Sequence, residues 1–108
     1  MKYDVVIIGA GPAGIFTALE LVRNGSDKKI LMVEKGKPVD KRHCPKAETG
    51  KCMNCKPNCM ITTGFSGAGA FSDGKLSLSC EVGGELPNLI GSEFAQELID
   101  YTDKIYLE

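Results

Sequence analysis

The sequence predicts an α/β fold that opens with a single βαβ unit. Residues 3–8 and 29–33 are short apolar runs rich in β-branched side chains, which is typical of buried strands. Between them, apolar residues recur at helical spacing, at Ile15, Ala18, Leu19 and Val22. Strand, helix and strand fit within about thirty residues, the size of one right-handed βαβ unit.

Local signals mark both ends of the expected helix. Pro12 suits the first helical turn, because the N–H that proline lacks would have no helical partner there. Asn24 and Gly25 provide a stop at the carboxyl end. The turn residues therefore agree with the periodicity.

Size and composition exclude several classes of protein. With 108 residues, of which 43% are hydrophobic, the chain has room for one small globular domain. Apolar runs such as Val5–Ile8 are far too short to span a membrane. The first residues lack the pattern of a secretory signal, so we expect a cytoplasmic protein without membrane contacts.

Positive charge gathers in one stretch of the chain. Residues 35–60 hold seven lysines or arginines against two acids, whereas residues 80–108 hold seven acids and one lysine. The basic stretch contains no aromatic residue that would stack on bases, so we expect no nucleic-acid partner. A solvated loop, or a loop close to an anionic cofactor, is the favoured interpretation.

The rest of the chain predicts less regular structure. Residues 37–63 show no sustained period and hold four cysteines, so we expect a long Cys- and Lys-rich loop after a core of residues 1–36. In residues 64–108 we expect a glycine-rich segment, then a strand at 75–79. A helix capped at Asn88 or Ser92 and a further strand from residue 105 complete the prediction.

A glycine-rich turn joins the first strand to the helix. Gly9, Gly11 and Gly14 match the pattern G-x-G-x-x-G in the required context of a strand before and a helix after. The first glycine allows the tight turn, the second lets the backbone approach a phosphate, and the third lets the helix pack closely on the strand. The helix start stabilises a pyrophosphate by about 0.3–1 kcal/mol per charge at an exposed end. The turn predicts a Rossmann-like unit that binds FAD or NAD(P).

Glu34 strengthens this prediction. It lies twenty residues after Gly14, at the expected tip of the second strand, where a carboxylate accepts hydrogen bonds from ribose hydroxyls. Its charge would repel a 2′-phosphate, which disfavours NADP. The alternative is a structural glycine turn with a solvated Glu34, which requires five independent features to coincide.

Four of the five cysteines lie within sixteen residues, at the spacing C-x7-C-x2-C-x3-C. Thiolates at such spacing suit tetrahedral zinc or an iron–sulfur cluster, although this spacing specifies neither. A redox dithiol beside the cofactor and free thiols in a mobile loop are the other interpretations. Flanking lysines favour thiolates, and hence either of the first two. The candidate metal ligands are Cys44, Cys52, Cys55 and Cys59.

His43 and Cys80 carry weaker signals. A lone histidine in a basic loop is expected to be solvated, although beside Cys44 it could ligate a metal or move a proton. Cys80, at the end of an expected strand, is more often a small buried hydrophobic residue. No Ser-His-Asp set or pair of metal-binding acids indicates a hydrolase.

Two stretches resemble known flavoproteins. Asp4–Gly14, together with Val33–Gly36, resembles the N-terminal ADP-binding segment of two-dinucleotide-binding-domain flavoproteins, and this resemblance favours FAD over NAD. Arg42–Pro45, the cysteines at 52, 55 and 59, and Gly64–Leu76 are similar to a group of poorly characterised bacterial FAD-dependent dehydrogenases. The resemblance runs over essentially the whole chain.

The resemblance implies an N-terminal fragment of an FAD-dependent oxidoreductase, because those proteins are several times longer. The flavin would transfer hydride or electrons, with a nicotinamide donor or a small-molecule substrate as partner in the intact protein. The fragment alone is expected to be inactive, and its exposed sheet edges would allow oligomers. The alternative function is a metal- or redox-regulated nucleotide-binding module without catalysis.

The resemblance also extends the expected cofactor site beyond the glycine turn. Residues 67–75 would run past the flavin ring, where Lys75 places positive charge near a reduced flavin. The alternative is a plain glycine-rich turn that leads into a strand. The expected cofactor contacts are Gly9, Gly11, Pro12, Ala13, Gly14, Glu34, Lys35, Arg42, Gly69, Ala70, Ser72, Gly74 and Lys75.

Overall fold

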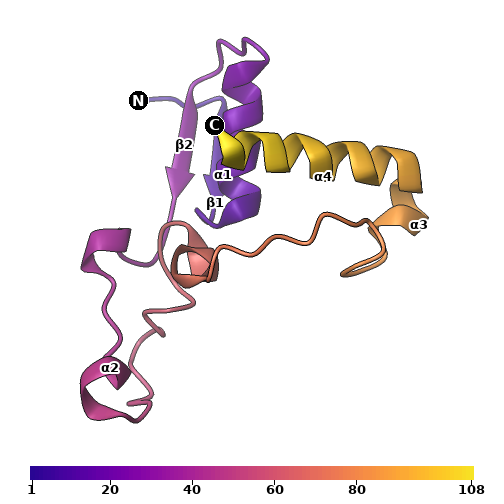
Figure 1. Cartoon of the computed structure of the whole chain (residues 1–108). Coiled ribbons are helices and arrows are strands. Elements are labelled where there is room, and N and C mark those ends of the chain that lie inside the picture. The colour runs from indigo at the N-terminus through magenta and orange to yellow at the C-terminus, as the bar shows by residue number, and fades with distance from the viewer. The chain divides into compact units, whose positions relative to one another are not determined.

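The computed structural model describes residues 1–108 (Figure 1). The chain divides into two compact units, Met1–Asp73 and Gly74–Glu108. The first unit contains both strands and the longest irregular segment, and the second is helical.

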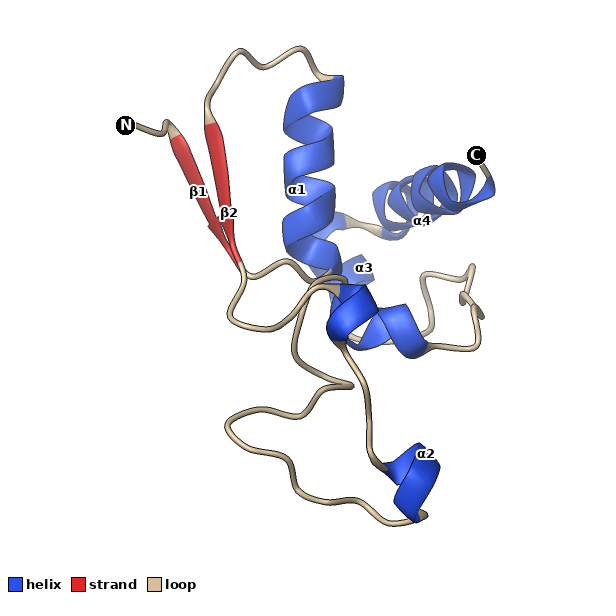
Figure 2. Ribbon diagram, turned by 90° about the vertical axis from the view of Figure 1, so that its left-hand side faces the viewer, coloured by secondary structure: helices blue, strands red, loops and turns tan.

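A βαβ unit opens the first unit, as the periodicity predicts. Strand β1 (Val5–Ile8) pairs in parallel with β2 (Ile30–Val33), and Val5 lies opposite Ile30 in the register. Helix α1 (Pro12–Arg23) connects them and lies beside the two strands in Figure 2. The prediction of a Rossmann-like α/β start is thus matched by strand, helix and parallel strand.

The ends of α1 also follow the sequence signals. Gly11 is the N-cap and Pro12 the first helical residue. At the other end, Gly25 adopts a left-handed φ of 72°, and its N–H donates to the carbonyl of Val22. The N–H of Ser26 donates to Leu21, so the last carbonyls of the helix are satisfied before the chain turns toward β2.

The start of α1 lies very close to β1. A Cβ added at Gly14 would lie 2.1 Å from the carbonyl oxygen of Gly9 and 3.1 Å from Cγ2 of Ile7. No side chain larger than hydrogen fits this gap, so Gly14 is required by packing. Around Gly11, by contrast, nothing lies within 4 Å of an added Cβ.

The loop after β2 is irregular, as expected, but its two ends meet. It contains a 3₁₀ turn at Val39–Lys41 and the one-turn helix α2 (Lys46–Thr49). Lys37 forms a parallel bridge with Gly64, where the chain returns. A 3₁₀ helix follows at Gly67–Phe71. The loop therefore leaves and re-enters the unit through a narrow neck (Figures 1 and 2).

In the second unit, the predictions of two strands are wrong. Residues 75–79 form no strand. No neighbouring strand supplies partners there, and the side-chain amide of Gln96 instead donates to Leu78 and accepts from the N–H of Cys80. Gln96 thus pairs one carbonyl and one N–H at the end of this stretch in place of a ladder.

Two helices make up the rest of the second unit. Helix α3 (Leu86–Ile90) contacts α4 (Ser92–Leu107). Neither expected cap is the N-cap of α4: that residue is Gly91, Ser92 is the first helical residue, and Asn88 lies inside α3. Residues 105–107, predicted as a strand, continue α4. Their apolar Ile105 extends the stripe that includes Leu98 at helical spacing, which explains why the helix persists.

The two-stranded sheet leaves apolar side chains uncovered. In β1, Val5 and Ile7 are half-buried, whereas Val6 and Ile8 are exposed, Ile8 to 87%. A parallel sheet normally has both faces covered. The prediction of oligomers through the sheet edges remains a prediction.

The contrast between Gly14 and Gly11 gives a matched test of this packing. Gly14→Ala forces backbone apart and should lower the free energy of unfolding toward the upper end of about 1–3 kcal/mol. Gly11→Ala meets open space and should cost only about 0.5–1 kcal/mol as an altered N-cap. Urea unfolding followed by circular dichroism measures both. Equal losses in the two variants would contradict the close approach.

Candidate functional site

The glycine-rich turn has the geometry of a phosphate-binding turn. Gly9 has a φ of 101°, which a side chain would strain, and its N–H donates to the carbonyl of Val33 at 2.7 Å. The first intrahelical bond runs from Ile15 to Gly11. The N–H groups of the preceding first turn have no partner within the helix and are suited to bind an anion.

Glu34 connects the end of β2 to this turn. Its Oε2 accepts a hydrogen bond from the N–H of Ala10 at 2.8 Å, and its Oε1 accepts one from the N–H of Gly36 at 2.8 Å. The carboxylate is half-buried and fixed beside the turn, as the spacing from Gly14 predicts. Each carboxylate oxygen has a further lone pair for another donor.

These contacts also shift the titration of Glu34. Hydrogen bonds from Ala10 and then Gly36 hold its pKa below the ordinary value of 4.5. Partial desolvation opposes this shift, and the charges of Lys35 and Arg42 add to it. Glu34 is therefore a carboxylate throughout the neutral range.

The glycine-rich segment of residues 64–71, which we call the 64–71 segment, lies against the same turn. The N–H of Ser66 donates to the carbonyl of Ala10 at 2.8 Å. A Cβ added at Gly67 would lie 3.6 Å from Cα of Gly11 and 3.5 Å from Cδ of Pro12. The structure thus brings three predicted features together: the Gly9–Gly14 turn, Glu34 and the glycine-rich segment.

Arg42 has a structural role that sequence reasoning missed. Its side chain is only 5% exposed, and its guanidinium donates to four main-chain carbonyls. It also lies 4.8 Å from the ring centroid of Phe71. One signal was available: Arg42 is the only arginine among the seven cations of residues 35–60. The planar guanidinium suits several simultaneous acceptors better than an ammonium does.

The other expected cofactor residues are distributed more widely. Gly69 and Ala70 lie in the 3₁₀ helix Gly67–Phe71, and the N–H of Ser72 donates to Gly69 at its end. Gly74 and Lys75 belong to the second unit. Their contact with a cofactor remains a prediction, as does that of Lys35, which lines a cavity.

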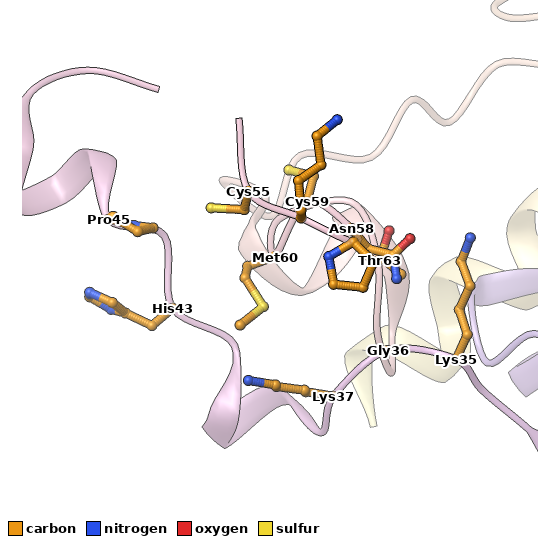
Figure 3. Close-up of a pocket in the computed structure, with 12 residues that line it drawn as sticks. Lys35, Gly36, Lys37, His43, Pro45, Cys55, Asn58, Cys59, Met60 and Thr63 are labelled. Carbon is orange, nitrogen blue, oxygen red and sulfur yellow. The ribbon is translucent and has the colours of Figure 1, made fainter. Parts of the chain in front are cut away.

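That cavity, of about 310 Å³, is lined by Gly36 among other residues (Figure 3). Lys35 and Lys37 line it from one stretch of chain, and Cys55, Cys59 and Met60 from another. The N–H groups of Ile61 and Thr62 and the Thr62 hydroxyl donate to the Cys59 sulfur and lower the pKa of its thiol from the ordinary 9.0. Cys59 is exposed and suited to react as a thiolate.

The four clustered cysteines do not form a ready metal site. All four line a second cavity of about 310 Å³, and all are free thiols. No group of three or more His, Cys, Asp or Glu side chains is arranged to hold a metal ion. His43 is exposed, as expected, and its Nε2 lies 3.0 Å from Oε1 of Glu48. Metal binding at these cysteines remains a prediction.

Comparison with known proteins agrees with the geometry of the turn. The family model of pyridine nucleotide-disulphide oxidoreductases matches residues 3–69, which span β1 to the 64–71 segment. The chain belongs to this family. Its members are Rossmann-like, FAD- or NAD-binding oxidoreductases, so the prediction of a dinucleotide-binding α/β unit is confirmed at this level. The cysteine-rich insertion remains a prediction.

Two relatives match parts of this oxidoreductase-family chain. An uncharacterized protein of Clostridium beijerinckii (strain ATCC 51743 / NCIMB 8052) is 44% identical over 77 residues, which cover 71% of this chain and 14% of that protein. The mitochondrial electron transfer flavoprotein-ubiquinone oxidoreductase of Dictyostelium discoideum is 45% identical over 42 residues, covering 35% of this chain and 7% of that protein. The chain thus spans a small part of these relatives. No solved structure matches it.

None of the helices combines the length and the apolar character needed to cross a bilayer.

The hydrogen bonds of Glu34 predict a pH-dependent contribution to stability. Because its pKa is lower in the folded chain than in the unfolded chain, the carboxylate stabilises the fold above its ordinary pKa of 4.5. This contribution is lost as the pH falls through the lower folded value. Glu34→Gln should therefore flatten the acid side of a stability profile measured by urea unfolding between neutral pH and about pH 3. Parallel profiles for the two proteins would contradict this prediction.

The environment of Cys59 predicts selective thiol reactivity. Cys59 and Cys52 are both exposed, but the pKa of Cys59 is lowered by donors from Ile61 and Thr62. Brief treatment with iodoacetamide at neutral pH should alkylate Cys59 several times faster than Cys52, as read by peptide mass spectrometry. Thr62→Val should slow Cys59 alone. Uniform labelling of both cysteines would show that these donors do not activate the thiol.

Proposed function

We propose that residues 1–73 bind the ADP portion of FAD and serve a flavin-dependent oxidoreductase. The observation that carries this proposal is the fixed carboxylate of Glu34, which bonds the N–H groups of both Ala10 and Gly36. It stands beside the glycine turn, where an acid can accept hydrogen bonds from a ribose. The same charge opposes a 2′-phosphate and so disfavours NADP.

The turn fits a pyrophosphate. Gly11 has no atom within 4 Å of the position that a Cβ would take, so an incoming phosphate can approach the backbone there. The helix that follows begins with Pro12 and presents its N-terminal dipole to the same space. Family membership supports a dinucleotide cofactor, and the resemblance to the ADP-binding segment of flavoproteins favours FAD.

The chemistry would be that of the flavin, which accepts or donates a hydride or single electrons. The residues of this chain bind and orient: the Gly9–Gly14 turn holds the phosphates, and Glu34 fixes the ribose. We assign only this binding step to the chain, because its match covers just 14% of the Clostridium relative. A nicotinamide donor or a small-molecule substrate would act on the complete protein, which we place in the cytoplasm.

A second candidate function rests on the cysteine-lined cavity. Four free thiols share that cavity, and Cys59 has activated surroundings. These features favour a nucleotide-binding module that responds to thiol oxidation or to a metal ion without catalysis of its own. It differs from the first candidate because it requires no flavin.

Binding measurements separate the two candidates. The chain should quench the fluorescence of added FAD, ADP should displace the FAD, and NADP should compete poorly. Gly11→Ala places a methyl group where the phosphate approaches, and the lost charged hydrogen bonds should weaken both FAD and ADP about tenfold or more. Gly69→Ala, which also meets open space, is the matched control for ADP binding.

The outcomes are distinct. If saturating FAD is not bound while ADP is, the flavin proposal fails and the second candidate gains support. If neither nucleotide binds the folded chain, both candidates fail. Retained FAD affinity in Gly11→Ala would show that the cofactor does not lie on the turn.

A further inference from the structure

Arg42 carries a positive charge that is almost fully buried. Its Nε donates to the carbonyl of Met60 at 2.8 Å, and one terminal nitrogen donates to Ile61 at 2.6 Å. The other terminal nitrogen donates to both Phe65 and Gly67, at 2.7 and 2.8 Å. Such hydrogen bonds from a charged donor are about twice as strong as neutral ones. The ring of Phe71 covers the guanidinium at 4.8 Å.

These acceptors belong to two different stretches of chain. Met60 and Ile61 lie where the cysteine-rich loop returns, and Phe65 and Gly67 lie in the 64–71 segment. One side chain therefore holds the end of the loop and the glycine-rich segment in a fixed arrangement. Their carbonyls would otherwise need other donors, because a buried polar group without a partner is costly.

The backbone around Arg42 is closely packed, with no room for a side chain at Gly64 or Gly36. A Cβ at Gly64 would lie 2.6 Å from Cδ of Arg42 and 2.6 Å from the carbonyl oxygen of Lys37. A Cβ at Gly36 would lie 2.4 Å from Cα of Gly64. Gly36, two residues after Glu34, thus packs directly against Gly64, the first residue of the segment that Arg42 holds.

The held segment reaches the phosphate-binding turn at one side. The bond from Ser66 to Ala10 and the approach of Gly67 to Gly11 and Pro12 fix this contact. Glu34 meets the same turn through the N–H of Ala10. The 64–71 segment therefore lies within reach of a dinucleotide whose pyrophosphate lies at Gly11.

We propose that Arg42 is a positioning residue of the dinucleotide site, which holds the 64–71 segment against the glycine turn as a binding surface for the half of the cofactor beyond the pyrophosphate. This inference rests on the proposed function. Arg42 then acts on the cofactor indirectly and not by contact, because its guanidinium donates to main-chain carbonyls. ADP, which lacks the second half, does not need this surface.

The comparison of FAD with ADP tests the role. Arg42→Lys keeps the charge, but an ammonium cannot reach four carbonyls in the planar arrangement of a guanidinium. Loss of at least one charged hydrogen bond should weaken FAD about tenfold or more, while ADP affinity should change less than about twofold. Fluorescence titration measures FAD, and calorimetry measures ADP. Lys41→Ala, an exposed neighbouring cation, is the matched control and should leave both affinities unchanged.

A second, milder variant tests the role even if Arg42→Lys unfolds the chain. Phe71→Leu removes the ring over the guanidinium and leaves its four carbonyl partners in place, so it should weaken FAD about two- to fivefold with ADP unchanged. Equal losses of FAD and ADP in Arg42→Lys and Phe71→Leu would show a purely structural role and overturn the inference. So would unchanged FAD affinity in Arg42→Lys. Failure of the wild-type chain to bind FAD would instead defeat the proposed function, and the inference with it.

Discussion

A single buried cation organises the irregular half of the first unit. Residues 37–71 contain no long helix and no strand, so their backbone polar groups cannot satisfy one another in a ladder. The guanidinium of Arg42 takes over four of the carbonyls and anchors both ends of the returning chain. Because these acceptors are neutral carbonyls, they do not cancel the positive charge of Arg42, which still acts electrostatically on nearby ionisable groups. It contributes to the lowered pKa values of Glu34 and Cys59 alike.

The nucleotide site itself is made mainly of backbone. Gly9, Gly11 and Gly14 contribute a turn, an open approach and a close packing contact, and none of these depends on a side chain. Glu34 contributes a side chain beside the turn, and its carboxylate accepts hydrogen bonds from two N–H groups. Such a site depends on accurate backbone placement. That placement comes from the β1–β2 register on one side and from Arg42 on the other.

Local signals explain what could be predicted from the sequence. The βαβ unit, the ends of α1 and the place of Glu34 follow from periodicity, glycine positions and spacing within about thirty residues. The partners of Arg42 could not be predicted, because they lie 18–25 positions away and are main-chain carbonyls, which every residue type carries. The prediction of a strand at residues 75–79 was wrong for a related reason. Alternation indicates a strand only where a partner strand exists, and here Gln96 takes that place.

The narrow neck between Lys37 and Gly64 has a consequence for how this chain can change. The residues that support the nucleotide site, Arg42 and Met60–Ile61, lie near the neck, and the part with α2 lies beyond them. Doubling the length of a loop whose ends are already fixed costs only about 0.6 kcal/mol. The distal part is therefore nearly free to lengthen, shorten or exchange its sequence. Segments inserted into α2, between Lys46 and Thr49, should therefore be accepted without moving the glycine turn.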